Sequence, residues 1–383
     1  MRIWIENPFD NLPLEGFRPQ RYWLMAEAFS KAGCDVVLWT ADFNHTTKGK
    51  RVLREQKAQP FALRLVEEPA YGGNVSLCRM YAHWRYARNW RREAEAFAEE
   101  HGAPDAIIVS TPPLSTGCTA RRLAARFGAK LVFDVMDAWP ETFERIVPRW
   151  MLWPLRNIAR ANYLGADLIT VVADRYAGLV REYGYTGKVE RHYHGIDISG
   201  APPRIVSDGA RLRLAYVGNL GRTYDLATVV RALAEIPDAT LDVAGKGDGE
   251  ARLRALVSEL KLENRVTLHG YLDGREMVEM LAGCNVGVVP MDDSSCVGVP
   301  YKFCDYAKAG VAIVSSLGGE SAALLAKHGA GAVYRHGDHA SLARVLRSLD
   351  AEKAGANARR MAETTLDSSV IYAAYVQSVL NIA

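Results

Sequence analysis

Residues 298–310 read Gly-Val-Pro-Tyr-Lys-Phe-Cys-Asp-Tyr-Ala-Lys-Ala-Gly and predict a short helix that leads into a strand. Pro300 suits the first turn of a helix, where its missing N–H group costs no hydrogen bond. Gly310 suits the end of the helix, and the apolar residues 311–314 that follow are typical of a buried strand. A helix that leads directly into a strand is the repeating unit of a parallel α/β sheet.

The start of this predicted helix also offers chemistry. The backbone N–H groups of Gly298 and Val299 would lie at a helix N-terminus, which carries about half a positive charge and binds phosphate. Lys302 adds a full positive charge one turn in. Asp305 follows on the same face, where a carboxylate can accept hydrogen bonds from a ribose. The alternative is an ordinary amphipathic helix with a surface ion pair.

Outward from this stretch, short apolar runs alternate with helical patterns along the whole chain of 383 residues. The alternation predicts parallel sheets with crossover helices, and the length favours two domains. We therefore expect an α/β fold with two doubly wound, Rossmann-like domains that face each other across a ligand-binding cleft. The expected strands are Arg2–Glu6, Asp35–Thr40, Ala106–Ser110, Lys130–Asp134, Asp167–Val172, Leu212–Val217, Thr240–Ala244, Arg265–His269, Asn285–Pro290 and Val311–Ser315.

The domain boundaries follow from composition. A stretch rich in proline and glycine is the best candidate linker and spans residues 199–210. It separates an N-terminal domain, residues 1–198, from a C-terminal domain, residues 211–367. The last segment, residues 368–383, is helical and apolar on one side, and we expect it to cross back to the first domain and brace it.

The composition limits the classes of protein. The net charge is +3, which argues against general nucleic-acid binding. The chain has no apolar run long enough to cross a membrane, and its N-terminus lacks the apolar stretch of a signal peptide. The six cysteines are scattered without a Cys-x-x-Cys pair, which favours a reducing cytosol over a disulfide framework or a zinc site.

Arginines and aromatic residues are interleaved in two segments, residues 79–92 and 145–160. Such a mixture suits an anionic membrane surface or a lipid-linked phosphate. The alternative is a solvated basic helix face whose aromatic side chains point into the core.

The second half opens with a glycine-containing loop directly after a predicted strand. Gly218 and Gly221 flank Asn219 and would let the backbone approach a ligand closely. Arg222 can bind a diphosphate with two parallel hydrogen bonds, although the same pattern also fits a simple tight turn. Further on, Tyr271 follows another strand and could either stack on a nucleobase or pack in the core.

The first half places three acidic residues close together at the end of a predicted strand. Asp134 and Asp137 could accept hydrogen bonds from a sugar, and Asp137 or Glu141 could act as a base toward an acceptor hydroxyl. The alternative is a helix cap with acidic residues in the first turn. No Asp-x-Asp motif occurs, so the sequence does not indicate a metal clamp on a diphosphate.

Taken together and in order, these motifs resemble the family-four glycosyltransferases of the two-domain GT-B fold, in particular the bacterial members that build surface polysaccharides such as O-antigen, capsule or exopolysaccharide. The resemblance covers nearly the whole chain. It rests on Glu15-Gly16, Asp42–His45, Ser110–Pro113, Asp134–Glu141, Gly218–Arg222 and Gly298–Tyr306.

The resemblance implies a retaining, metal-independent glycosyltransferase that needs no cofactor. The donor would be a nucleotide diphosphate sugar, with a UDP-sugar favoured, bound in the C-terminal domain. The acceptor would bind in the N-terminal domain. It implies that Arg222 and Lys302 hold the diphosphate, that Asp305 binds the ribose, that Gly298 and Val299 offer backbone N–H groups, and that Gly16 lies under the phosphates.

The expected acceptor is a glycan linked to polyprenyl diphosphate, which would place a cytoplasmic protein at the inner face of the membrane. The chain departs from the family where a pair of glutamates eight residues apart is common, because Val297 and Asp305 occupy these positions. This departure leaves open a nucleotide-sugar epimerase of the same fold and an inactive scaffold relative. As catalytic residues we expect Asp137, Arg222 and Lys302.

Overall fold

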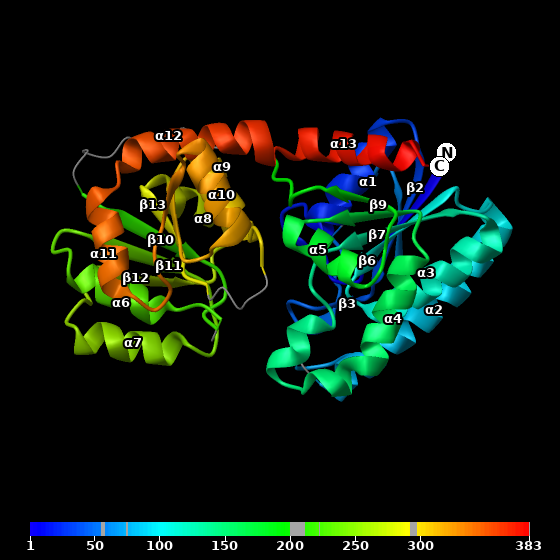
Figure 1. Cartoon of the computed structure of the whole chain (residues 1–383), viewed down its shortest axis with the longest axis horizontal. Helices are drawn as coiled ribbons and strands as arrows, with labels where there is room; N and C mark the ends of the chain where they lie inside the picture. Colours follow the sequence, from blue (N-terminus) through cyan, green and yellow to red (C-terminus); the bar gives the residue numbers. More distant parts are fainter. Residues whose placement is uncertain (55–57, 74–75, 200–210, 222, 292–296, 383) are drawn as a thin grey trace. The chain divides into compact units, whose positions relative to one another are not determined.

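The structure, a computed structural model, describes residues 1–54, 58–73, 76–199, 211–221, 223–291 and 297–382. The chain divides into two compact units, each with its own sheet and helices (Figure 1). Unit 1 is Met1–Tyr193 together with Ser369–Ala383, and unit 2 is His194–Ser368. Most of the expected linker, residues 200–210, lies outside the described residues, so the expected domain boundaries stay predictions.

Unit 1 holds a seven-stranded parallel sheet with the order β5-β2-β1-β6-β7-β8-β9. The chain extends from β1 in one direction and, from β6 onward, in the other. Ligands of doubly wound sheets bind beyond the carboxyl ends of the strands at such a reversal. The strands are β1 (Arg2–Glu6), β2 (Asp35–Ala41), β5 (Ala62–Val66), β6 (Ala106–Thr111), β7 (Lys130–Val135), β8 (Leu168–Val171) and β9 (Lys188–Arg191), beside a small hairpin of β3 (Phe43–Asn44) and β4 (Gly49–Lys50).

Helices cover both faces of this sheet. Right-handed crossovers place α1, which leads toward β2, on the opposite face from α3, which leads toward β7. In Figure 1, α1 lies beside α13, and α3 lies beside α2 and α4. The helices of unit 1 are α1 (Arg21–Lys31), α2 (Leu77–His101), α3 (Leu114–Phe127), α4 (Trp153–Leu164), α5 (Asp174–Glu182) and α13 (Ser368–Leu380), with short 3-10 turns η1 (Pro13–Glu15), η2 (Glu141–Arg145) and η3 (Arg149–Leu152).

A buried ion pair ties α1 to the middle of the sheet. Arg21 and Asp134 are both inaccessible to solvent, and two hydrogen bonds of 2.7 Å join the guanidinium to the carboxylate. Tyr22 and Thr170 also donate to Asp134. Burial alone would raise the pKa of Asp134, but Arg21 and these donors lower it below its usual value. The expectation that Asp134 faces a ligand is therefore wrong, because its oxygens are already bonded inside the core.

The C-terminal helix packs on this ion pair, as expected from the sequence. Tyr375 on α13 lies 3.1 Å from the Thr170 hydroxyl, and its ring is 5.6 Å from the Arg21 guanidinium carbon. Phe29 on α1 meets the same ring edge-on. The last segment of the chain is thus part of unit 1 and helps to close its core.

Unit 2 repeats the doubly wound plan with a six-stranded parallel sheet in the order β12-β11-β10-β13-β14-β15, which reverses between β10 and β13. Its strands are β10 (Arg213–Val217), β11 (Thr240–Ala244), β12 (Val266–Gly270), β13 (Val286–Val289), β14 (Ala312–Ser315) and β15 (Gly331–Val333). Its helices are α6 (Leu226–Ala234), α7 (Glu250–Glu259), α8 (Gly274–Ala282), α9 (Tyr301–Ala309), α10 (Gly319–His328), α11 (His339–Ser348) and α12 (Ala351–Met361), followed by the π-helical turn η5 (Ala362–Leu366).

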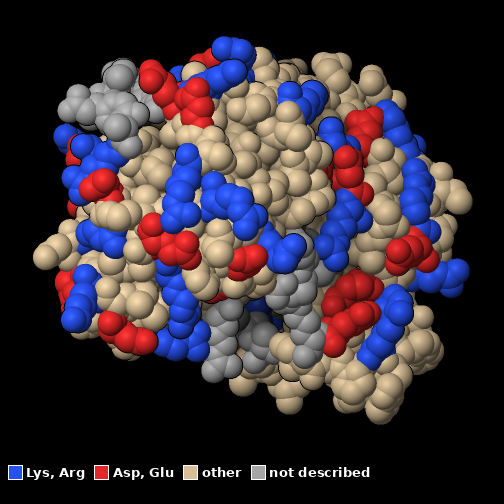
Figure 2. Space-filling model, turned by 60° about the vertical axis from the view of Figure 1, so that its left-hand side comes forward, with Lys and Arg blue, Asp and Glu red and all other residues tan. Residues whose placement is uncertain are grey.

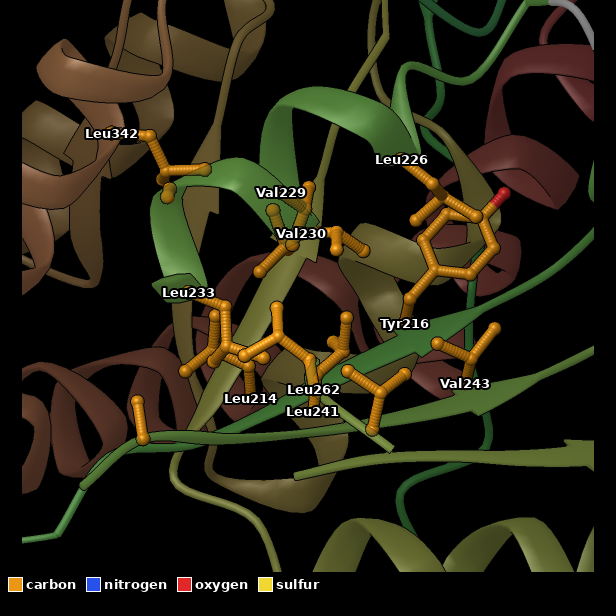
Figure 3. Packing of buried hydrophobic residues seen from close by; sticks show 14 of the residues in the cluster. Leu214, Tyr216, Leu226, Val229, Val230, Leu233, Leu241, Val243, Leu262 and Leu342 are labelled. Atoms are coloured by element: carbon orange, nitrogen blue, oxygen red, sulfur yellow. The ribbon is translucent and has the colours of Figure 1, made fainter. Parts of the chain in front are cut away.

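The core of unit 2 forms where α6 packs on the central strands. Figure 3 shows Val230 and Leu233 of α6 pointing toward Leu214 and Leu241 of the sheet. Leu342 of α11 extends the same cluster, and all five side chains are almost fully buried. This apolar layer holds β10 and β11 in place, so the loops at their carboxyl ends start from a rigid base.

The expected fold class is confirmed, and each of the ten expected strands has a counterpart. Besides the two strands of the small hairpin, β3 and β4, the strands that were not expected from the sequence are β5, β9 and β15. These last three lie at the edges of their sheets and lack a continuous apolar run, because an edge strand need not be buried on both faces.

The surface charge is mixed on the face drawn in Figure 2. Among its described residues, basic and acidic side chains are interspersed rather than separated into fields of one sign. Electrostatic recognition on this face must therefore come from local groups.

Among the described helices, none combines the length and the apolar character needed to cross a membrane.

Candidate functional site

In unit 2 the reversal of strand order brings two segments together, the loop after β10 and the first turns of α9. Gly218 begins the loop, and Lys302 lies on the first turn of the helix. A Cβ atom built on Gly218 would lie 3.0 Å from the Lys302 Nζ atom. Gly218 and Lys302 therefore lie next to each other.

Lys302 lies in a cage of two aromatic rings. Its Nζ atom is 4.3 Å from the ring centre of Tyr216 and 3.6 Å from that of Tyr224, and it donates to the Tyr216 hydroxyl at 3.1 Å. The residue is 7% exposed. Burial lowers the pKa of Lys302 to about 7, and the nearby Asp305 opposes this shift. An anion bound here would favour the charged ammonium.

Two glycines shape the loop beside this cage. Gly218 has φ of +137° and Gly245, after β11, has φ of +145°, conformations that favour glycine. A Cβ atom on Gly245 would lie 1.8 Å from the Gly218 carbonyl oxygen. The backbones of the two loops are therefore in direct contact, and neither position accepts a larger residue without movement.

The rest of the loop is held by hydrogen bonds to its main-chain groups. The Tyr216 hydroxyl donates to the carbonyl oxygen of Asn219 at 2.6 Å, while the Asn219 side chain is exposed. Gly221 is half-buried and lies against Asn219. Arg222, the expected diphosphate ligand, lies outside the described residues, and so do Asp292, Asp293 and Ser294 in the segment before α9.

The helix that carries Lys302 and Asp305 is anchored to both central strands by Tyr306. The Tyr306 hydroxyl accepts the Val217 N–H group at 3.0 Å and donates to the Val288 carbonyl oxygen at 3.2 Å. Gly287 makes room for the ring, because a Cβ atom there would lie 2.3 Å from the Tyr306 Cγ atom. Asp305, the preceding residue on this helix, is also buried.

The start of α9 differs by one residue from the expectation. Pro300 is the N-cap and Tyr301 is the first helical residue, and the cap has no side-chain hydrogen bond among the described residues. The carbonyl oxygen of Gly298 accepts a hydrogen bond of 2.5 Å from Ser321, and Val299 is buried. Binding of a donor by the N–H groups of Gly298 and Val299 stays a prediction.

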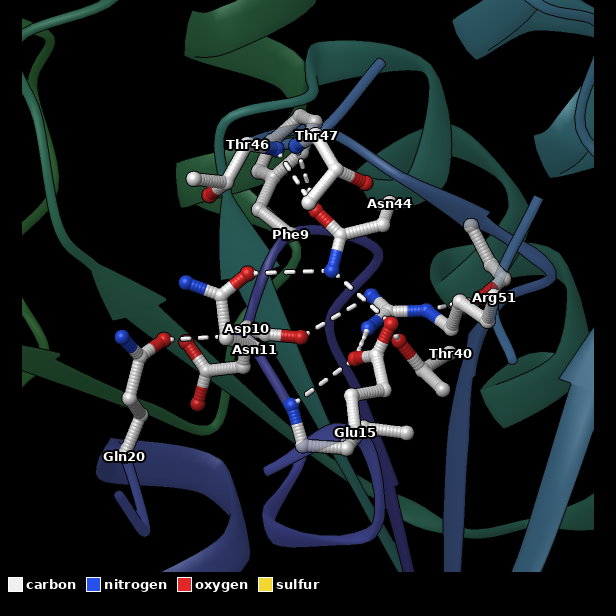
Figure 4. A network of polar contacts seen from close by, with 12 residues as sticks. Phe9, Asp10, Asn11, Glu15, Gln20, Thr40, Asn44, Thr46, Thr47 and Arg51 are labelled. Atoms are coloured by element: carbon white, nitrogen blue, oxygen red, sulfur yellow. Dashed lines mark hydrogen bonds and ion pairs between the residues drawn. The ribbon is translucent and has the colours of Figure 1, made fainter. Parts of the chain in front are cut away.

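In unit 1 a polar network holds the loop that contains Gly16. Gly16 has φ of +90°, and the neighbouring Glu15 carboxylate binds three donors (Figure 4). These are the Leu12 N–H group at 3.0 Å, the Asn44 amide at 2.9 Å and the Arg51 guanidinium. Glu15 thus stabilises the loop, and the expected position of Gly16 under donor phosphates stays a prediction.

Comparisons with known proteins agree with this arrangement. The family described as "Glycosyltransferase Family 4" matches residues 21–199. The family described as "Glycosyl transferases group 1" matches residues 202–365. The chain belongs to the family-four glycosyltransferases. Together the two matches span both units of this glycosyltransferase.

Among curated proteins, the glycosyltransferase is similar to WcaL of Escherichia coli (strain K12), which is named for colanic acid biosynthesis. The two are 26% identical over 160 residues. This match spans 39% of the chain and 39% of WcaL, so it covers well under two thirds of that relative. What WcaL acts on therefore enters only as support for a proposal.

Solved structures share the whole fold at low sequence identity. Sucrose-phosphate synthase from Thermosynechococcus elongatus has a TM-score of 0.74 at 15% identity and covers 100% of this chain and 98% of its own. Anabaena HepE in complex with UDP has a TM-score of 0.70 at 13% identity, with 99% of each chain covered. The apo form of the lipopolysaccharide outer core galactosyltransferase WaaB has a TM-score of 0.63 at 14% identity and covers 100% and 99%. These likenesses show the GT-B fold.

Asp137 of the glycosyltransferase follows β7 in unit 1 and binds mainly its own loop. Its Oδ1 atom accepts the Ala138 N–H group at 2.8 Å and the Thr142 hydroxyl at 3.3 Å. Burial raises the pKa of Asp137, while these hydrogen bonds and the charge of Arg79 act against the rise. This geometry is closer to the structural alternative that the sequence left open, and a role as base stays a prediction.

Sequence reasoning did not identify the two rings around Lys302. Tyr216 lies on a strand and Tyr224 follows the next loop, far from α9 in the sequence, and no spacing rule links them to a lysine on another helix.

Tyr271, the expected nucleobase contact, is 60% exposed and not part of the core. Among the described residues, no group of three or more His, Cys, Asp or Glu side chains could hold a metal ion.

Proposed function

We propose that this chain transfers a sugar from a nucleoside diphosphate sugar, with a UDP-sugar favoured, to a hydroxyl group of a glycan acceptor. The supporting observation is the caged Lys302 beside Gly218 at the strand-order reversal of unit 2. Its pKa of about 7 leaves the ammonium only partly charged, and a diphosphate would restore the full charge. Structures with the same fold were solved with UDP and with UDP-glucose.

The proposed step exchanges one bond at the anomeric carbon. The bond to the diphosphate oxygen breaks, and the acceptor oxygen bonds to the same face, so the configuration is retained. The departing diphosphate oxygen takes the proton of the acceptor hydroxyl. Lys302 and Arg222 neutralise the charge that develops on the diphosphate, which is usually the largest catalytic contribution, and Asp305 accepts a hydrogen bond from the ribose. With these cations, the proposal needs no metal ion or protein nucleophile.

Substitution of Lys302 by methionine tests this proposal. Methionine keeps the length and apolar stem but removes the charge, so the fold should survive while the transfer rate falls by about 100-fold or more. Lys308→Met, on the same helix, should stay within about threefold of the unchanged protein. Transfer is measured as release of UDP in the presence of acceptor, and equal rates in the two variants would remove Lys302 from the site.

The donor must be identified first. A thermal-shift screen with UDP, GDP, ADP and dTDP uses the fact that a ligand that binds the folded state stabilises it by mass action. Incubation with the matching nucleotide sugar alone then separates the possible activities. An epimerase converts the sugar without acceptor, whereas a transferase requires acceptor, and binding without turnover would indicate the scaffold role that Val297 leaves open.

For the acceptor we propose a glycan linked to polyprenyl diphosphate at the inner face of the membrane, in surface-polysaccharide synthesis. The proposal of surface-polysaccharide synthesis is supported by the name of WcaL, which refers to colanic acid biosynthesis, and by that of WaaB, which refers to the lipopolysaccharide outer core. In unit 1, Trp150 is 77% exposed and Trp153 is 66% exposed. They line a groove together with Arg149, Arg156 and Arg160. The alternative that these aromatic side chains point into the core is therefore wrong for both tryptophans, and exposed tryptophan beside arginine favours a membrane interface.

A further inference from the structure

Two tyrosine rings enclose the Lys302 ammonium in unit 2, and neither belongs to the helix that carries the lysine. Tyr216 lies on β10, and Tyr224 lies near the end of the loop that follows this strand. The two ring centres are 5.9 Å apart, with 66° between the ring planes. The Lys302 Nζ atom lies 4.3 Å from the first ring centre and 3.6 Å from the second. With Gly218 also close to Nζ, the ammonium is packed between β10 and both ends of this loop.

The Tyr216 hydroxyl connects Lys302 to the loop. It accepts an N–H group of Lys302 at 3.1 Å and donates its hydrogen to the Asn219 carbonyl oxygen at 2.6 Å. Because a hydroxyl has one hydrogen, a hydroxyl that donates to Asn219 binds the ammonium as an acceptor. Tyr216 is fully buried. The orientation of Lys302 and the position of the Asn219 peptide therefore depend on the same hydroxyl group.

The Tyr224 ring is held in place from a second loop. Tyr224 forms an antiparallel bridge with Met291, shortly after β13. The N–H group of Asp225 donates to the Pro290 carbonyl oxygen at 2.8 Å, and the N–H group of Tyr224 donates to the Gly221 carbonyl oxygen at 3.2 Å. The backbone that carries the ring is therefore fixed to the carboxyl end of β13, the strand that lies across the reversal from β10.

The titratable groups around Lys302 come from the same elements. Burial lowers the pKa of Lys302 to about 7, and the charge of Asp305 on α9 opposes this shift. Burial raises the pKa of Tyr216, Tyr224 and Tyr306, so these side chains are neutral at neutral pH. Among the described residues, the charged form of Lys302 is therefore supported by the Tyr216 hydroxyl, by the two rings and by Asp305.

We propose that Tyr216 and Tyr224 are positioning residues of the donor site: the Tyr216 hydroxyl orients the Lys302 ammonium and the Tyr224 ring confines it, so that its charge is in place before the diphosphate binds. A charged group that is already in position stabilises developing charge without reorganisation, whereas an unrestrained lysine side chain samples many rotamers. That the ligand is a diphosphate rests on the proposed function, but the link between Tyr216 and the charge of Lys302 does not.

Calorimetric titration with UDP tests the hydroxyl. In the free chain Lys302 is mostly charged at about pH 6 and mostly neutral at about pH 8. Tyr216→Phe keeps the ring and the burial but removes the acceptor, so it should lower the pKa of Lys302 further. Relative to the unchanged chain, we expect UDP affinity to fall about tenfold at about pH 8 but less than about threefold at about pH 6. A loss of equal size at both pH values would indicate a merely structural role and would overturn the proposal.

Two substitutions of Tyr224 test the ring. Tyr224→Leu keeps an apolar side chain but removes the ring, and UDP affinity at about pH 8 should fall about fivefold. Tyr224→Phe keeps the ring and should recover most of the affinity that Tyr224→Leu loses, because the role belongs to the ring and not to the hydroxyl. Phenylalanine should therefore be harmful at position 216 and tolerated at position 224. Equal losses in Tyr224→Leu and Tyr224→Phe would contradict the role of the ring.

NMR of lysine side chains gives a measurement that needs no ligand. The side-chain signals of a lysine report its protonation, and Lys302→Met identifies the signals of Lys302. We expect a titration midpoint of about 7 in the unchanged chain and a lower midpoint in Tyr216→Phe. The same midpoint in both chains would show that the Tyr216 hydroxyl does not support the charge of Lys302.

Tyr163→Phe is the matched control for removal of a buried hydroxyl. Tyr163 is fully buried in unit 1, and its hydroxyl has no hydrogen-bond partner among the described residues. This substitution should leave UDP affinity within about twofold of the unchanged chain at both pH values. Thermal unfolding checks each variant first. Should Tyr216→Phe not fold, the contrast between Tyr224→Leu and Tyr224→Phe decides the outcome.

Lys302→Met separates the positioning role from the proposed function. If Lys302→Met binds UDP as tightly as the unchanged chain, Lys302 does not hold the diphosphate and both are wrong. If Lys302→Met loses affinity while Tyr216→Phe and Tyr224→Leu keep it, donor binding by Lys302 stands and the positioning role alone is wrong.

Discussion

Lys302 shows how the surroundings of one residue set its chemistry. An unfolded lysine has a pKa of about 10.4, whereas burial between Tyr216 and Tyr224 lowers the pKa of Lys302 in the folded chain to about 7. Between these two values the unfolded state binds more protons. Lys302 therefore makes the free energy of unfolding larger as the pH rises from about 7 toward about 10.4. As the pH falls back toward 7, the free energy of unfolding becomes smaller again.

Donor binding should consequently take up a proton. At pH 8 the free Lys302 is mostly neutral, and the negative diphosphate raises its pKa and charges it. Calorimetry of UDP binding at pH 8, in two buffers with different heats of ionisation, should show uptake of up to about one proton per UDP bound. Lys302→Met should show none, and a binding heat that does not depend on the buffer would contradict the assignment of Lys302 to the diphosphate.

Gly245 tests the contact between the two loops of unit 2. Alanine at this position would place its Cβ atom 1.8 Å from the Gly218 carbonyl oxygen and would have to adopt φ of +145°. We expect Gly245→Ala to destabilise the chain by about 2 kcal/mol or more and to weaken UDP binding. Gly274→Ala, where the added atom meets nothing within 4 Å, is the control. Equal unfolding temperatures for both variants would refute the close approach.

Between elements, the buried ion pair of Arg21 and Asp134 joins α1, β7 and β8 beneath α13. Arg21→Met leaves the Asp134 carboxylate buried without its partner, which should cost about 3–5 kcal/mol. The exposed pair of Arg254 and Glu250 on α7 offers a comparison, and Arg254→Met should cost less than about 0.5 kcal/mol. Thermal unfolding measures both variants. Similar losses would mean that the buried pair does not hold the C-terminal helix on the core.

At the level of the whole molecule, the exposed tryptophans predict how the chain meets a membrane. The expected result is co-sedimentation with vesicles that contain phosphatidylglycerol, weakening as salt screens the arginines. Trp150→Ala with Trp153→Ala should reduce binding by about tenfold, because tryptophan anchors at the interface are removed without disturbing the core. Reversal of Arg149, Arg156 and Arg160 to Glu should reduce it further.

The control for charge reversal lies in unit 2. Arg252, Arg254 and Arg275 are exposed there, and changing them to Glu alters the net charge by the same amount. Equal sedimentation of both reversed variants would show that net charge, rather than the groove at residues 149–160, decides membrane binding.

Local pattern was enough for much of the fold. Continuous apolar runs identified the central strands because both faces of a parallel sheet are buried. The edge strands β5, β9 and β15 were missed because edge positions tolerate polar residues. For the site, a glycine after a predicted strand and a lysine at a predicted helix start singled out Gly218 and Lys302, which lie next to each other in the structure. Their role in donor binding stays a prediction.

The amino-acid sequence by itself determined the α/β class, the doubly wound plan, the family and the helix that carries Lys302 and Asp305, because these depend on the periodicity and motifs of neighbouring residues. Only the tertiary structure decided which acids are buried and which cations are caged. Arg21 and Asp134 are 113 residues apart, and Lys302 lies 86 residues from Tyr216. Burial and pKa depend on every atom around a group, and packing brings those atoms from distant parts of the chain.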